Sequence, residues 1–73
     1  MKFTVTAPNG MTAARCEVTQ DDTVYLANKQ GDPMQTNFLD ALPEAWQGAV
    51  RTLRDDSRAV AVNLVDGVVI SRA

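Results

Sequence analysis

The sequence predicts a small α+β domain, with one helix packed on an antiparallel sheet made of two hairpins and a third strand. Three observations predict this class. An Asn-Gly pair separates two alternating runs near the start, an Asp-Gly pair separates two apolar runs near the end, and apolar residues recur at helical spacing between them. A chain of 73 residues has room for one core, so residues 1–73 are expected to form a single domain.

The first hairpin is predicted around Asn9-Gly10, because this pair readily adopts the positive φ angles of a two-residue turn. Pairing outward from the turn gives one apolar and one polar face, so a single register satisfies both. The apolar face pairs Ala7 with Thr12, Val5 with Ala14 and Phe3 with Cys16, and the polar face pairs Thr6 with Ala13, Thr4 with Arg15 and Lys2 with Glu17.

A third strand is predicted over Thr23–Ala27, where the alternation turns Tyr25 to the outer face. The next segment, Asn28–Thr36, is rich in turn-forming residues and is expected to be a surface loop. Loops of this kind often carry contacts to partners. Tyr25 on its strand and Met34 in the loop are therefore candidate contact residues.

A helix is predicted to begin near Asn37 and to end at about Asp56. Asparagine is a common helix-capping residue, and Pro43 is tolerated in a first turn because its missing N–H would be unpaired there. The residues at helical spacing that form the expected core stripe are Leu42, Trp46, Ala49, Val50 and Leu53.

A second hairpin is predicted at the end of the chain, where Ala59–Val65 and Val68–Ser71 flank Asp66-Gly67. The simplest register places apolar pairs on both faces, Leu64 with Val69 and Val65 with Val68. Two arrangements fit this pattern. Either the hairpin lies inside the sheet with cover on both sides, or one apolar face is left for a partner.

Side chains that usually carry catalysis are scarce. The chain has no histidine, which removes the common general base and the common metal ligand together. Cys16, the one cysteine, is expected to be buried beside Phe3. The acid pairs Asp21-Asp22 and Asp55-Asp56 are expected to be solvated turn and helix-end charges. The sequence thus predicts a protein that is not an enzyme, with no catalytic residue, metal site or cofactor.

Composition also bears on location and partners. A single cysteine suits a reducing cytoplasm, and no apolar tract is long enough to span a bilayer, so a cytoplasmic protein without membrane attachment is expected. The formal net charge of −2 argues against a strongly basic nucleic-acid binder. Arg51, Arg54 and Arg58 follow at helical spacing and form a cationic stripe that Asp55 and Asp56 partly neutralise. Nucleic-acid contact is therefore expected to be weak or indirect.

The opening MKFTVTAPNGMTAARCEV, the length of 73 residues and the ending VNLVDGVVISRA resemble the small transcription regulators of lytic Xanthomonas phages across the full chain. The resemblance implies a protein of the host cytoplasm that binds host RNA polymerase near the amino-terminal region of the β′ subunit. It further implies that binding blocks σ-dependent initiation and suppresses termination. The contact residues predicted from exposure are Tyr25, Met34, Arg51, Arg54 and Arg58.

Two other functions stay open at this level. One is a small RNA- or DNA-binding module that uses the arginine stripe. The other is a homo-oligomeric interaction domain that pairs the edge of its last hairpin, although a monomer is expected in the free state.

Overall fold

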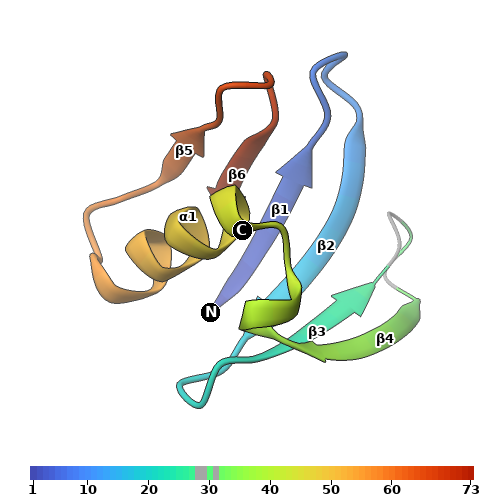
Figure 1. Cartoon of the computed structure of the whole chain (residues 1–73). Helices are drawn as coiled ribbons and strands as arrows, with labels where there is room; N and C mark the ends of the chain where they lie inside the picture. Colours follow the sequence, from blue (N-terminus) through green and yellow to red (C-terminus); the bar gives the residue numbers. More distant parts are fainter. Residues whose placement is uncertain (28–29, 31) are drawn as a thin grey trace.

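The computed structural model describes residues 1–27, 30 and 32–73, with the backbone alone at positions 33 and 34. These residues form a six-stranded antiparallel sheet with one α-helix packed on it (Figure 1), which confirms the predicted α+β class. The strands are β1 (Lys2–Thr6), β2 (Thr12–Val18), β3 (Thr23–Ala27), β4 (Pro33–Phe38), β5 (Ala61–Asn63) and β6 (Val69–Arg72). The helices are the short 3-10 helix η1 (Leu39–Ala41) and the α-helix α1 (Glu44–Asp55).

The strands lie in the order β4-β3-β2-β1-β6-β5. The last strand of the chain, β6, therefore pairs with the first, β1, in the interior of the sheet, while β4 and β5 form the two edges. This order answers a question that the sequence left open. The second hairpin is half inside the sheet, through β6, and half at its edge, through β5.

The first hairpin has the predicted register along most of its length. Phe3 lies opposite Cys16, and the observed pairs agree with the predicted ones from Lys2 as far as Val5. Beyond Val5 the register shifts, so that Thr6 pairs with Thr12 and not with Ala13. The predicted pairing near the turn was therefore wrong by one residue.

The turn itself explains this shift. The N–H of Gly10 donates to the carbonyl of Ala7 at 2.9 Å, and the N–H of Ala7 donates to the carbonyl of Met11 at 2.8 Å. Pro8 and Asn9 are thus the two central residues of the turn. The residue with the positive φ, at 86°, is Gly10, which follows them. A glycine in this conformation after a tight turn adds one residue to the returning strand, which produces the bulge.

The second hairpin differs from its predicted register in the same way. Gly67 has a φ of 90° and donates its N–H to the carbonyl of Leu64 at 3.1 Å. The strands consequently pair Val62 with Ile70, and not Leu64 with Val69. Because side chains alternate along a strand, this shift by one residue exchanges the faces of β5 relative to β6. Ile70 is fully buried, and Val62 packs against the core beside it.

The helix contributes Ala49, Val50 and Leu53 of the predicted apolar stripe to the core, whereas Leu42 precedes the helix and is buried after η1. α1 contacts β5 and β6 directly (Figure 1). Its buried side chains share one core with the inward-facing residues of β1, β2, β3 and β6. Trp46 is half-buried against this core. The buried core residues are Phe3, Val5, Cys16, Val18, Val24, Leu39, Leu42, Ala49, Val50, Leu53 and Ile70. Burial of this apolar surface is the main source of stability in a chain of this size.

Two predictions between β3 and α1 were wrong. Part of the expected loop over Asn28–Thr36 is strand β4, and residues 28, 29 and 31 lie outside the described residues. Asn37 does not cap a helix, because it lies opposite Val24 in the β3–β4 ladder. The α-helix instead begins at Glu44, after Pro43. Pairing with β3 has overridden the local turn propensity of this segment.

The end of the helix is held by the last strand. The Arg72 guanidinium of β6 donates to the carbonyl oxygens of Leu53, of Asp56 at 2.9 Å and of Ala59 at 3.1 Å. Carbonyl groups at a helix carboxyl end have no partner within the helix. Arg72 satisfies them from the sheet and so joins the two layers.

Candidate functional site

One face of the sheet carries none of the described helices, because α1 lies on the other face (Figure 1). We call this surface the open face. Alternation along each strand and the pairing between strands identify its residues. They are Lys2, Thr4 and Thr6 of β1, Arg15 and Glu17 of β2, Thr23, Tyr25 and Ala27 of β3, Thr36 and Phe38 of β4, and Ser71 of β6.

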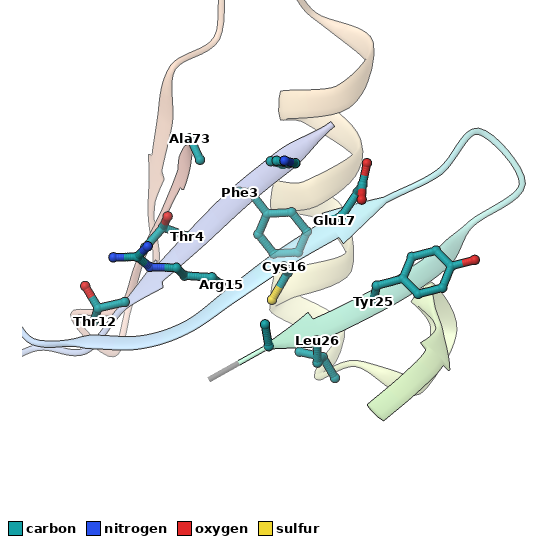
Figure 2. Close-up of a pocket in the computed structure, with 11 residues that line it drawn as sticks. Phe3, Thr4, Thr12, Arg15, Cys16, Glu17, Tyr25, Leu26 and Ala73 are labelled. Atoms are coloured by element: carbon teal, nitrogen blue, oxygen red, sulfur yellow. The ribbon is translucent and has the colours of Figure 1, made fainter. Parts of the chain in front are cut away.

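An open groove of about 750 Å³ crosses the open face over β1, β2 and β3. Figure 2 shows its two ends: Arg15 lies beside Thr4 at one end, and the Tyr25 ring projects at the other. Glu17 lies on β2 directly opposite Tyr25. The residues that line the groove are Lys2, Phe3, Thr4, Thr12, Arg15, Cys16, Glu17, Tyr25, Leu26, Ala27 and Ala73.

Two aromatic side chains stand on the open face. Tyr25 keeps 48% of its surface exposed and Phe38 keeps 68%. Tyr25 lies opposite Thr36 and Phe38 lies opposite Thr23, so the two aromatic residues are diagonal neighbours on adjacent strands. Diagonal neighbours of this kind lie about 7–8 Å apart, within reach of one flat ligand group or side chain.

The orientation of Tyr25 agrees with the predicted alternation, whereas Phe38 was missed. Phe38 follows the segment that the sequence predicts to be a loop and lies within the predicted helix. The segment Pro33–Phe38 reads PMQTNF and does not alternate between polar and apolar residues, so only the pairing of β4 with β3 assigns Phe38 to the open face. The side chain of Met34, the other predicted contact of this region, lies outside the described part of the chain.

The arginine stripe is not a free cationic surface. Arg54, with only 10% of its side chain exposed, forms an ion pair with Asp22 and donates to the carbonyl of Thr19 at 3.0 Å. The bond to Asp22 raises the pKa of Arg54 further. Arg51 approaches the same carboxylate at 3.8 Å. The expectation that the Arg54 side chain is exposed was wrong, because folding brings the β2–β3 turn against the helix.

Arg58 is the one member of the stripe that is almost fully exposed. Its Nε lies 3.5 Å from the carboxylate of Asp56. This pair sits after the end of α1, on the helix side of the sheet. The structure therefore brings Tyr25 together with neither Arg51, Arg54 nor Arg58.

The cations of the open face have no such partners. Among the Lys and Arg side chains that the structure describes, Arg51, Arg54 and Arg58 are in ion pairs and Arg72 is bound to carbonyl groups. Lys2 and Arg15, which make no ion pair, lie on the adjacent strands β1 and β2. Both line the groove.

Cys16 is buried beneath the groove, opposite Phe3, as the sequence predicts. Burial raises the pKa of its thiol from 9.0 to about 11. At pH 8 the fraction of reactive thiolate is then about a hundredfold smaller than for an exposed cysteine. We expect Ellman's reagent to modify the folded chain about a hundredfold more slowly than the urea-unfolded chain, and equal rates would contradict a buried thiol.

The same shift makes stability fall at high pH. Below pH 9 the Cys16 thiol is protonated in both the folded and the unfolded chain, so its full contribution to the free energy of unfolding is present. Between pH 9 and about pH 11 the unfolded chain ionises first, and the free energy of unfolding declines. Urea unfolding across this range should show the decline in the natural chain and a smaller one in Cys16→Ala. A profile that is identical in the two chains would contradict the shift.

The described residues also answer two simpler questions. No three His, Cys, Asp or Glu side chains among them are grouped so as to hold a metal ion. In the same part of the chain, no helix has the length and apolar character needed to cross a membrane. Comparison of the chain with family models, with curated proteins and with solved structures finds no match.

Proposed function

We propose that this protein is a non-enzymatic phage transcription regulator that binds host bacterial RNA polymerase through the open face of its sheet. One observation supports the choice of surface: none of the described helices covers this face, and it presents two exposed aromatic residues and two cations without ion pairs. Tyrosine and arginine are among the residues that most often dominate the energy of protein interfaces. The identity of the partner comes from the resemblance of the two chain ends to phage regulators.

The size of the open face suits this role. The two larger dimensions of the chain are 29 and 27 Å. Any one side of a molecule of that size has a projected area of at most about the 800 Å² that each partner contributes to a standard protein interface. A chain of 7.9 kDa that binds in this way uses most of one side.

Binding alone is sufficient for both regulatory effects that we propose. A protein seated near the amino-terminal region of β′ blocks σ-dependent initiation if it occupies space that the σ-containing enzyme needs. It suppresses termination if it binds the elongating conformation of the polymerase more tightly than the terminating one, because a ligand shifts an equilibrium only by its differential affinity. Neither effect requires chemistry on the regulator.

The aromatic pair provides the test. Tyr25→Ala is expected to weaken the affinity for host core RNA polymerase by about tenfold, the loss typical of an interface anchor. The matched control is Val65→Thr, because Val65 is fully exposed at the β5–β6 turn. Surface plasmon resonance with immobilised core enzyme measures both, and circular dichroism confirms that each variant is folded. Wild-type affinity in Tyr25→Ala would exclude the open face as the binding surface.

A further inference from the structure

We infer that the segment of the partner that lies on the open face is an acidic peptide segment, and that Arg15 binds one of its carboxylates. The inference deepens the proposed function and rests on it for the identity of the partner. The chemistry of the segment follows from the groove itself.

The charges of the groove single out Arg15. Lys2 lies directly opposite Glu17 on the neighbouring strand, so its charge is partly balanced. Arg15 lies opposite Thr4 on one side and Ala27 on the other, and neither neighbour is charged. Among the described residues, Arg15 is therefore an exposed cation that makes no ion pair and faces no acidic residue on either paired strand.

The neighbours of Arg15 extend a row of donors across the sheet. Thr4 pairs with Arg15 on one side and with Ser71 on the other, so two hydroxyl groups follow the guanidinium along this row. A guanidinium presents a planar fork that matches the two oxygens of a carboxylate, and the hydroxyl groups can donate to the same anion. An anionic side chain laid across β1 and β2 would find all of its hydrogen bonds there.

A peptide fits this surface better than a nucleic acid. Glu17 lies two residues from Arg15 on the same strand and face, directly opposite Tyr25 at the other end of the groove. A continuous phosphate backbone that followed the groove would meet this carboxylate, and the chain already has a net charge of −2. A peptide segment can place one carboxylate at Arg15 and an uncharged or basic side chain at Glu17. It can also place an apolar side chain on Tyr25 and Phe38.

The free chain tests the ligand chemistry without the polymerase. We would titrate the isotope-labelled protein with a decapeptide of alternating glutamate and threonine, with its glutamine analogue and with a short oligothymidylate. The expected result is a shift of the Arg15 Nε–H resonance and of neighbouring β1 and β2 amides with the glutamate peptide alone, lost in Arg15→Gln. The inference is overturned by no shift, by equal shifts with the glutamine analogue, or by stronger binding of the oligonucleotide.

The polymerase tests the sign of the charge effect. Arg15→Gln should weaken binding to host core RNA polymerase by about tenfold, and Glu17→Gln should strengthen it, with both effects shrinking as salt rises. Asp66→Asn makes the same charge change as Glu17→Gln but lies at the β5–β6 turn, where no effect is expected. The reverse result, in which Arg15→Gln strengthens binding and Glu17→Gln weakens it, would mean a basic segment and would refute the inference.

The two experiments separate the two proposals. If the wild-type chain captures no polymerase while the glutamate peptide binds at Arg15, the proposed function fails and the acidic ligand stands. If polymerase binds with equal affinity to the wild type and to Arg15→Gln, the inference fails and the proposed function stands.

Discussion

Asp22→Ala is expected to lower the free energy of unfolding by about 2 kcal/mol, because it removes one of the two carboxylates that pair with the largely buried Arg54 side chain and leaves only Asp55. Arg54 lies on α1 and Asp22 in the β2–β3 turn, 32 positions away in the chain. Only 10% of the Arg54 side chain is exposed, whereas 42% of the Asp22 side chain is, so water compensates the lost carboxylate only in part. Urea unfolding followed by the fluorescence of Trp46, the one tryptophan, measures the change.

Backbone conformation contributes to the same substitution and can be separated from it. Asp22 has a φ of 65°, in the left-handed region, where an alanine costs about 1 kcal/mol. Asp22→Gly removes the carboxylate without this cost, and Asp22→Asn keeps an acceptor in a residue that tolerates the conformation. We expect stability in the order wild type, Asp22→Asn, Asp22→Gly, Asp22→Ala. An Asp22→Gly variant as stable as the wild type would show that the ion pair contributes nothing.

Arg72→Met is expected to destabilise the fold by a similar amount, about 2–3 kcal/mol, because one guanidinium serves three carbonyl groups at the end of α1. Methionine retains much of the apolar stem, so the loss reports the hydrogen bonds. The same urea titration measures it.

Arg58→Met is the matched control for this substitution. The Arg58 side chain is 92% exposed, and its removal should change the stability by less than about 0.5 kcal/mol. Arg72→Lys should recover part of the loss, because an ammonium group can reach some but not all of these oxygens. If Arg72→Met and Arg58→Met unfold at the same urea concentration, β6 does not hold the helix end.

Much of the candidate site could be predicted from the sequence at the level of single strands. The alternation along β1, β2 and β3 assigns Lys2, Arg15 and Glu17 to one face and Tyr25 to the outside, because side chains on a strand must alternate. Alternation does not show whether another element of the chain packs on a given face of the sheet. Whether Arg15 or Arg54 remains available depends on where the helix packs, and this is decided between segments far apart in the chain.

Phe38 and the second hairpin are two places where local sequence preferences predict the wrong structure. Local turn propensity predicts a loop before Phe38 and a two-residue turn at Asp66-Gly67, and both predictions follow rules that hold on average. The available edge of β3 makes Pro33–Phe38 a strand, and the burial of Ile70 against Val62 selects the register of β5 and β6. In each place the contacts of a whole element outweighed a preference of a few residues.

The sequence by itself determined the α+β class, the inner and outer faces of the first three strands, the core stripe of the helix and the burial of Cys16. These properties follow from backbone periodicity and from the removal of apolar side chains from water, and both act over short distances in the chain. Only the tertiary structure decided that β6 pairs with β1, that β4 exists, that Asp22 binds Arg54 and that the open face stays uncovered. Those outcomes depend on which complete surfaces fit together, and no local pattern encodes that choice.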